Sequence, residues 1–194
     1  MVDGVWFDST GTRLVADVKT NDGMWCYIID GVPQKEYVGE GGLSFSPSGR
    51  HYFSYGARSA SGIAVLVYDG VEIAQAEHVG RTWLGGESPD ELIWVEEAGT
   101  KQTLWVGHGG QFSAEEIVQR NILYDPVSRQ AGAVVKDGDK WRVFFGDAKS
   151  PAMDEILGGP VVDESGNIVC IGRCGSQVKK FVFALGMTEC RVLE

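Results

Sequence analysis

One basic residue occurs in each of five similar segments of the chain, and these five residues are the clearest candidates for a binding role. Each is expected where the second strand of a segment turns into the third: Lys19, Arg58, Lys101, Lys136 and Arg173. Ammonium and guanidinium groups gathered on one face attract and orient the carboxylates of a partner. Arg81 and Arg120 add two cations in the connections between segments. The spacing predicts a basic face that binds an acidic protein segment or peptide. In the alternative interpretation, these side chains only solvate exposed strand ends.

Acidic residues are expected at the opposite ends of the same strands, at Asp8, Asp30, Asp69, Asp125, Asp147 and Asp163. Asp8, Asp125 and Asp163, together with Ser46, stand at the start of a turn. A short side chain with an oxygen accepts hydrogen bonds from the backbone N–H groups of such a turn. The three aspartates could instead ring a central channel and hold a cation. Turn capping already accounts for them, so we expect neither a metal nor a cofactor.

No group of residues in the sequence predicts catalysis. His51, His78 and His108 lie at no known metal-ligand spacing, and no GxSxG elbow is present. A glycosidase needs paired carboxylates near the channel, and the expected inner strands, such as residues 43–45 and 122–124, contain none. The glycine-rich residues 39–42 precede a strand, so they lack the helix N-terminus that binds phosphate. We therefore expect no catalytic residue and a protein that is not an enzyme.

An internal repeat sets the positions of all these residues. Its apolar anchors lie 38 to 40 residues apart, at Phe7, Phe45, Leu84, Tyr124 and Val162. Each unit contains one segment rich in β-branched and aromatic residues and bounded by Gly, Ser, Asp or Asn: residues 14–16, 52–55, 92–95, 133–135 and 168–171. A period of this length, with four short strands in each unit, predicts the blade of a propeller.

The predicted fold class is all-β, a β-propeller with five blades of four antiparallel strands. We expect one domain over residues 1–194, with blades at about 1–40, 41–80, 81–120, 121–158 and 159–194. Residues 113–118 occupy the fourth-strand position of the third unit. Because all blades are in phase, a five-bladed ring would close by side-chain packing alone. Alternatively, the chain forms part of a longer propeller or assembles with another copy.

Two segments resemble those of a known group of propellers. Residues 45–50, FSPSGR, resemble the FSPDG signature of TolB-like, WD-repeat-like propellers. Residues 140–147, KWRVFFGD, resemble a KWxVVVDG segment found in bacterial proteins of that group. The similarity covers essentially the whole chain, and the third unit, with an insertion at residues 85–90, diverges most. The resemblance implies a β-propeller, often one that binds partners, and it transfers no catalytic residue.

Composition limits the kinds of binding partner and the cellular compartment that we expect. A net charge of -10 disfavours sequence-independent binding to nucleic acid, which needs a basic surface. No apolar run approaches the length needed to span a membrane, so we expect no membrane partner. Residues 1–4 lack the basic start of a signal peptide. A cytoplasmic location is favoured, or a periplasmic or secreted one if a leader was removed.

Four cysteines are present without a CxxC pair, and we expect them to be reduced. A disulfide would mainly concern Cys174 and Cys190, which share one repeat. The sequence leaves the oligomeric state open.

Three of the six tryptophans recur near the start of a third strand, at Trp25, Trp105 and Trp141. We expect them to pack blade against blade. If exposed beside polar groups, they would instead form platforms for sugar rings. The predicted function is therefore a non-enzymatic binding module, a protein–protein interaction scaffold. The alternative is a small-ligand or carbohydrate-binding propeller with repeated sites.

Overall fold

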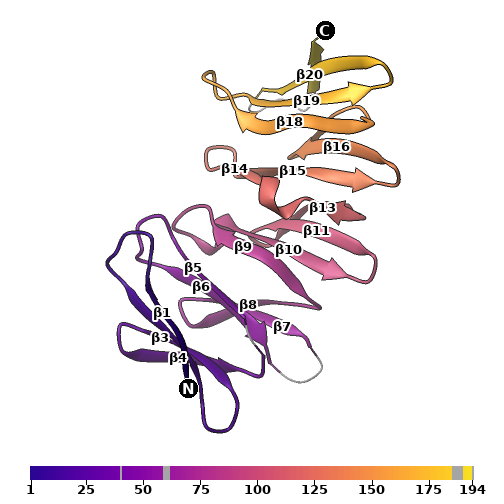
Figure 1. Ribbon diagram of the computed structural model, residues 1–194. Coiled ribbons are helices and arrows are strands. Elements are labelled where there is room, and N and C mark those ends of the chain that lie inside the picture. The colour runs from indigo at the N-terminus through magenta and orange to yellow at the C-terminus, as the bar shows by residue number, and fades with distance from the viewer. Residues whose placement is uncertain (40, 59–61, 185–189, 194) are drawn as a thin grey trace. The chain divides into compact units, whose positions relative to one another are not determined.

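A computed structural model describes residues 1–39, 41–58, 62–184 and 190–193. Glu40 in the glycine-rich segment and Leu185 after the last third strand lie outside the described residues. In the described part, strands and two short 3-10 turns make up the regular structure, without an α-helix. The strands form five antiparallel sheets that follow one another along the chain (Figure 1). The predicted fold class, all-β with five four-stranded blades of the propeller type, is confirmed.

The five sheets, named sheet 1 to sheet 5 in chain order, have the following strands. Sheet 1 contains β1 Val2–Phe7, β2 Leu14–Lys19, β3 Trp25–Ile29 and β4 Val32–Tyr37. Sheet 2 contains β5 Gly42–Phe45, β6 Tyr52–Ala57, β7 Ala64–Tyr68 and β8 Val71–Ala76. Sheet 3 contains β9 Val79–Leu84, β10 Leu92–Ala98, β11 Lys101–Val106 and β12 Gly109–Ala114, with η1 Pro89–Glu91 before β10.

The first strand of sheet 4 is broken by a 3-10 turn into β13 Glu116–Ile117, η2 Gln119–Asn121 and β14 Leu123–Asp125. The sheet continues with β15 Gln130–Asp137, β16 Lys140–Phe145 and β17 Ala148–Lys149. Sheet 5 contains β18 Glu155–Val162, β19 Ile168–Cys174, β20 Gln177–Phe183 and β21 Cys190–Leu193. Each expected apolar second strand lies within β2, β6, β10, β15 or β19, because β-branched and aromatic residues suit a pleated, buried strand.

The prediction for residues 113–118 is wrong at its C-terminal end. β12 already fills the fourth place of sheet 3 and ends at Ala114. Glu116 and Ile117 pair with Lys136 and Val135 of β15, so they open sheet 4. The first strands of sheets 3, 4 and 5 consequently start at Val79, Glu116 and Glu155, a few residues before the expected blade starts.

The chain divides into two compact units, Met1–Glu96 and Glu97–Glu194, here unit 1 and unit 2, with the boundary inside β10. In unit 1, sheets 1 and 2 bury one core around Val15, Tyr27, Ile29 and Tyr52. Alternate residues of each strand point to this core, as the two-residue period of a strand requires. That the chain forms one domain with a closed ring stays a prediction.

Unit 2 has its own core between sheets 4 and 5. Val134, Val143 and Phe145 of sheet 4 contact Phe181 and Phe183 of sheet 5. Each of these five side chains is almost fully buried. Blades of this protein therefore pack face to face through large apolar side chains. Among the described residues, none of the helical segments is long and apolar enough to cross a membrane.

Candidate functional site

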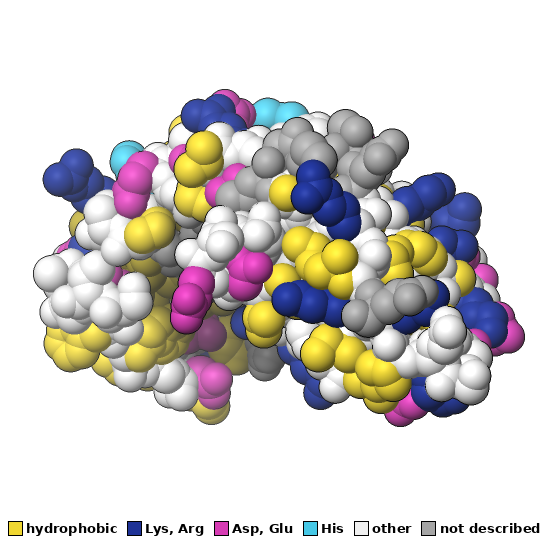
Figure 2. Space-filling model, turned by 90° about the horizontal axis from the view of Figure 1, so that it is seen from above, with side chains coloured by type: hydrophobic (Ala, Val, Ile, Leu, Met, Phe, Trp, Pro, Cys, Tyr) yellow, Lys and Arg dark blue, Asp and Glu magenta, His cyan; other side chains and the backbone are white. Residues whose placement is uncertain are grey.

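The five predicted cations all lie at hairpins between second and third strands. Lys19 and Arg58 belong to unit 1, and Lys101, Lys136 and Arg173 belong to unit 2. Two of them already have an ion-pair partner: Arg58 pairs with Glu72, and Arg173 pairs with Glu155. Carboxylates thus accompany the cations, and Figure 2 shows Asp and Glu side chains next to several Lys and Arg side chains. Binding by these five residues stays a prediction.

Two of the lysines rest on tryptophan rings at equivalent positions in sheets 1 and 4. Lys19 Nζ lies 5.3 Å from the ring centroid of Trp25, and Lys136 Nζ lies 5.9 Å from that of Trp141. In both sheets the lysine and the tryptophan are direct cross-strand partners. A cation over an indole face is attracted by the ring quadrupole. The pairing holds each ammonium group over a half-buried ring.

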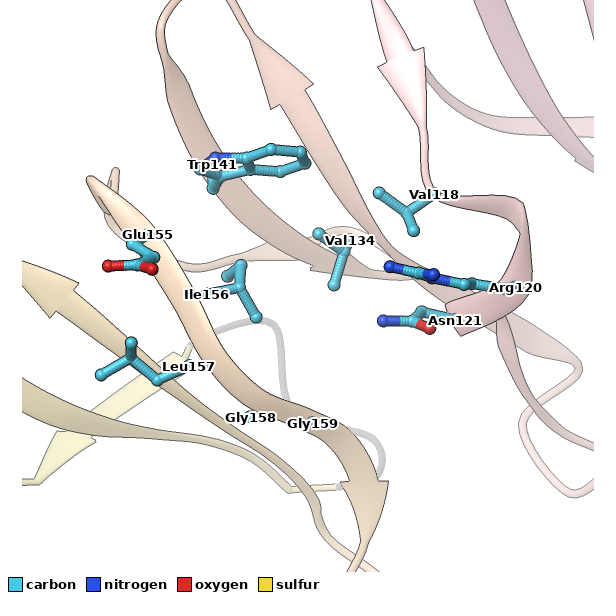
Figure 3. Close-up of a pocket in the computed structure, with 10 residues that line it drawn as sticks. All are labelled: Val118, Arg120, Asn121, Val134, Trp141, Glu155, Ile156, Leu157, Gly158 and Gly159. Carbon is cyan, nitrogen blue, oxygen red and sulfur yellow. The ribbon is translucent and has the colours of Figure 1, made fainter.

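A pocket of about 330 Å³ opens in unit 2 between sheets 4 and 5 (Figure 3). Its apolar wall contains Val118, Val134, Ile156 and Leu157, and Trp141 lies at one end. This volume falls at the lower end of the ~300–1,000 Å³ typical of small-molecule sites. The pocket can hold one side chain or one small ring.

Two local interruptions of the strands create this pocket. On one side, η2 breaks the first strand of sheet 4, so a continuous strand does not fill the space. On the other side, the register of β18 with β19 shifts on both sides of Gly158. A Cβ atom at Gly158 would meet no heavy atom within 4 Å, which shows the open space beside this strand.

Arg120 and Asn121 project from η2 into the pocket (Figure 3). Among the described residues, the Arg120 side chain has neither an ion-pair partner nor a hydrogen-bond partner. Across the pocket, Glu155 accepts hydrogen bonds from two nitrogens of Arg173, at 3.0 and 3.2 Å. Arg173 therefore satisfies the charge of Glu155, whereas the charge of Arg120 remains available. Such a site favours an anionic group attached to an apolar stem, since guanidinium presents a planar fork of donors to a carboxylate.

The turn-capping prediction is confirmed. Asp8 accepts hydrogen bonds from the N–H groups of Thr12 and Arg13 at 2.8 Å each, and from the Thr10 hydroxyl at 2.6 Å. Equivalent bonds join the Ser128 N–H to Asp125, the Asn167 N–H to Asp163 and the His51 N–H to the Ser46 hydroxyl. Burial acts to raise the pKa of Asp8, but these hydrogen bonds outweigh it and lower the pKa to about 2.

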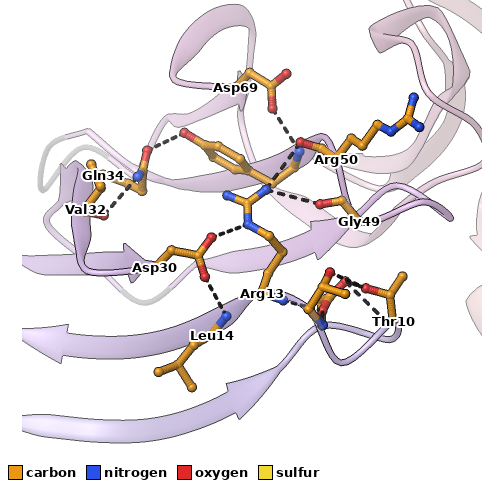
Figure 4. A network of polar contacts seen from close by, with 12 residues as sticks. Thr10, Arg13, Leu14, Asp30, Val32, Gln34, Gly49, Arg50 and Asp69 are labelled. Carbon is orange, nitrogen blue, oxygen red and sulfur yellow. Dashed lines mark hydrogen bonds and ion pairs between the residues drawn. The ribbon is translucent and has the colours of Figure 1, made fainter.

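Asp30 and Asp69 have a second structural role in unit 1 (Figure 4). Both begin Asp-Gly turns in which both residues have positive φ, as in type I′ hairpin turns. Asp30 accepts the Leu14 N–H at 2.8 Å and pairs with Arg13. The N–H of Leu14, followed by the Arg13 side chain, lowers the pKa of Asp30. Asp69 repeats the pattern with the Tyr52 N–H at 2.9 Å and His51 Nδ1 at 2.6 Å. These acids stabilise hairpins.

The expectation that inner strands carry no carboxylate is wrong, because those strands are longer than expected. Asp3 lies in β1, Glu116 in β13, Asp125 in β14 and Glu155 in β18. Of these, Glu155 lines the pocket, and it is the single carboxylate among the described lining residues. The described residues contain no group of three or more His, Cys, Asp or Glu side chains placed to hold a metal ion.

The four cysteines are free thiols in the structure. Burial, and after it the neighbouring Cys190, raises the pKa of Cys170 to about 12, so this thiol stays protonated at neutral pH. A protonated, buried thiol is a poor nucleophile. Cys170 therefore acts as part of the core of unit 2.

Three residues of the pocket stand out in the sequence for other reasons. Arg120 is a cation between repeats, and Trp141 is expected to pack blade on blade. Glu155 occupies the same place in its repeat as Glu36, Glu77 and Glu116 do in theirs. The sequence does not predict the pocket itself, because the pocket depends on the approach of η2 to β18. Two signals could have indicated it: the polar residues 119–121 inside a strand-like stretch, and the consecutive glycines 158 and 159.

No protein-family model matches the chain, and no curated protein matches its sequence. Solved structures similar to it include the β-propeller domain of the Trilobed protease from Pyrococcus furiosus, with a TM-score of 0.46 and 12% identity over 90% of this chain. A eukaryotic initiation factor has a TM-score of 0.42 and 9% identity over 100%. A proposed 6-phosphogluconolactonase from Bacteroides fragilis has a TM-score of 0.35 and 15% identity over 100%.

The chain spans 66%, 65% and 58% of the lengths of those three proteins. At these identities and TM-scores, the likeness carries no conclusion about activity, substrate or partner.

Proposed function

We propose that this chain is a non-enzymatic binding module and protein-interaction scaffold whose partner presents an acidic segment. The pocket of unit 2 receives one carboxylate of that segment. The observation that carries the proposal is the unpaired guanidinium of Arg120, which projects into a pocket that combines polar groups with apolar side chains. An incoming carboxylate would find donors on Arg120 and Asn121, while its stem contacts Ile156 and Val134.

The surroundings of the pocket support an anionic ligand. Lys136 lies over Trp141, which lines the pocket, and Arg173 neutralises Glu155. Two of the hairpin cations predicted from the sequence thus lie beside the pocket. Hydrogen bonds to charged groups contribute about 1.5–3 kcal/mol each, more than neutral ones. One carboxylate on Arg120 is therefore enough to select an acidic peptide over a neutral one.

The test measures binding of a fluorescein-labelled peptide of alternating Glu and Leu by anisotropy, with a Lys and Leu peptide for comparison. We expect the acidic peptide to bind and Arg120→Glu to weaken it by more than tenfold, because truncating or reversing one partner of a charged pair costs about 2–5 kcal/mol and about 1.4 kcal/mol corresponds to tenfold. The control is Arg50→Glu, which reverses an exposed charge in unit 1. Equal affinity of Arg120→Glu and the unchanged chain would contradict the proposal.

A second candidate function is carbohydrate binding, which one feature of the same pocket favours. Trp141 lies in one cavity with Asn121 and Glu155, and an indole face beside polar side chains is the usual platform for a sugar ring. Calorimetric titration with mixed mono- and disaccharides separates the two functions. If a sugar released heat on binding, Trp141→Ala abolished that heat and the acidic peptide did not bind, the result would favour carbohydrate binding over peptide binding.

The finer predictions from the sequence belong to this proposal. They are the TolB-like or WD-repeat-like subtype, the single five-bladed domain and the cytoplasmic location. Cofactor and nucleic-acid partners are not part of the proposed function.

A further inference from the structure

Among its described lining residues, the pocket of unit 2 has one cation without a partner. Arg120 and Glu155 are its charged residues, and Glu155 already accepts two hydrogen bonds from Arg173. A ligand with one negative charge therefore satisfies the guanidinium of Arg120. A second carboxylate would meet no further cation among the described lining residues, and the net charge of -10 on the chain repels it.

The wall beside this cation is apolar and belongs to the core of unit 2. Val134 is 2% exposed, and Val118 and Ile156 pack on the same core. Val134 and Ile156 face the space into which Arg120 projects (Figure 3). Because burial of apolar surface is favourable, this wall selects a ligand with a sizeable apolar group close to its negative charge. The carboxylate of an internal Glu sits on a short methylene stem, which covers little of the wall.

The C-terminal residue of a peptide has both groups in the required places, because its α-carboxylate and its side chain are attached to the same carbon atom. A branched aliphatic side chain can cover Val134 and Ile156 while the carboxylate lies against Arg120. Asn121 projects beside Arg120, and its amide group both donates and accepts hydrogen bonds. It can therefore pair with the main-chain amide of the same terminal residue.

The rim of the pocket leaves a way out for the rest of such a peptide. Arg120, Glu155 and Leu157 line the pocket and are nevertheless exposed, Leu157 at 48%. A site for a free small molecule usually encloses most of its ligand. Beside β18, a Cβ atom at Gly158 would meet no heavy atom within 4 Å. This shape fits the end of a chain whose preceding residues continue into solvent.

We propose that the pocket of unit 2 binds the free C-terminus of a partner protein that ends in a branched aliphatic residue. In keeping with the proposed function, on which this assignment rests, the carboxylate that the pocket receives is the last one of the partner's segment. Arg120 binds this α-carboxylate through two N–H groups, as guanidinium groups commonly bind carboxylates. The aliphatic side chain contacts Val134 and Ile156, and the preceding residues leave past Leu157.

The test is calorimetric titration of the full chain with N-acetylated peptides, in which no label or terminal ammonium adds charge. The first peptide, Gly-Ser-Gly-Ser-Leu, ends in a free carboxylate, and the second is its C-terminal amide. The third is the alternating Glu and Leu peptide, also with a C-terminal amide. We expect the free acid to bind and both amides to bind at least about tenfold more weakly, because neither has an α-carboxylate. Replacing the terminal Leu with Gly should also weaken binding by about tenfold or more, since the apolar wall is then uncovered.

Two variants locate the carboxylate. Arg120→Met keeps an unbranched stem and removes the charge, so the preference for the free acid over its amide should disappear. Arg50→Met is the matched control, since it removes an exposed charge in unit 1 and should leave this preference unchanged. Melting temperatures show whether both variants are folded.

The outcomes separate the terminal carboxylate from the proposed function itself. If the amidated Glu and Leu peptide bound as tightly as the free acid, the C-terminal assignment would fall and the proposed function would stand. If no peptide bound, including the Glu and Leu peptide with a free C-terminus, both would fall. A preference for the free acid that persisted in Arg120→Met would place the carboxylate elsewhere and would also overturn both.

Discussion

Asp8 illustrates how much of this protein depends on single polar side chains. Asp8 is 7% exposed, and its carboxylate accepts hydrogen bonds from Thr10, Thr12 and Arg13 of one turn. Replacing the carboxylate leaves N–H groups of the turn without a partner, which is costly in a buried site. Gly49 of the next blade fits beside it, since a Cβ there would lie 2.5 Å from Asp8 Oδ2. The turn of sheet 1 and the turn of sheet 2 therefore approach each other closely at Gly49.

We expect Asp8→Asn to lower the melting temperature by a few degrees at pH 7. The difference from the unchanged chain should shrink in acid. The pKa of Asp8 is about 2 in the folded state against 3.8 for a free side chain. The stabilisation by the carboxylate is therefore complete above pH 3.8 and is lost as the pH falls towards 2.

The measurement is differential scanning calorimetry of both chains from pH 2 to pH 7, with Glu164→Gln as a control that removes an exposed charge. A difference in melting temperature that stays constant over the whole pH range would show that the Asp8 charge contributes nothing.

At the scale of strands and turns, glycines decide how closely neighbouring segments approach. Gly158 leaves space beside β18 and opens the pocket, whereas Gly132 in β15 allows neighbouring atoms of β16 to pack closely against it. A Cβ at Gly132 would lie 2.6 Å from the carbonyl oxygen of Phe144 and 2.6 Å from the ring of Phe145. Gly132 lies directly opposite Phe145 in the sheet, so the ring of Phe145 occupies the place of a side chain. A side chain added at Gly132 would therefore displace Phe145, which belongs to the core of unit 2.

Gly132→Ala is expected to reduce the free energy of unfolding by about 1–3 kcal/mol, the usual effect of overpacking a buried position. Gly158→Ala is the matched control on β18, where the added methyl group meets open space. Urea unfolding followed by tryptophan fluorescence gives both values. If the two variants unfolded at the same urea concentration, the close packing at Gly132 would not limit stability.

On the scale of the whole molecule, acidic residues outnumber basic ones 27 to 17. Long-range electrostatics therefore repels polyanions, and Arg120 acts only at short range inside the pocket. At 0.15 M salt the Debye length is about 8 Å, so one guanidinium group can select a carboxylate in contact with it while distant charges are screened. The chain should discriminate between a short acidic peptide that enters the pocket and a long duplex that cannot.

We accordingly expect no retardation of a 30-base-pair DNA duplex in gel shift at 0.15 M salt and about 10 µM chain, because duplex binding needs several cations placed along the phosphates. The acidic peptide serves as the positive ligand under the same conditions. Retardation of the duplex at low micromolar concentration would show that the hairpin cations form a continuous basic surface after all.

Features that depend on residues close together in the chain could be predicted from the sequence. The 38–40-residue period and the apolar runs predicted five four-stranded antiparallel sheets. The Asp and Ser caps of the turns were equally predictable, because Asp8 and the N–H groups that it binds lie within five residues. Even the cations at the hairpins followed from the repeat.

Features that depend on contacts between distant segments could not be predicted from the sequence. The pocket exists because η2 interrupts sheet 4 opposite the glycines of β18, and these segments are far apart in the sequence. The ion pairs of Arg58 with Glu72 and of Arg173 with Glu155 likewise join residues 14 and 18 positions apart. A periodic pattern fixes which side chains share a face of a strand, but burial and pairing depend on which other face, if any, covers them.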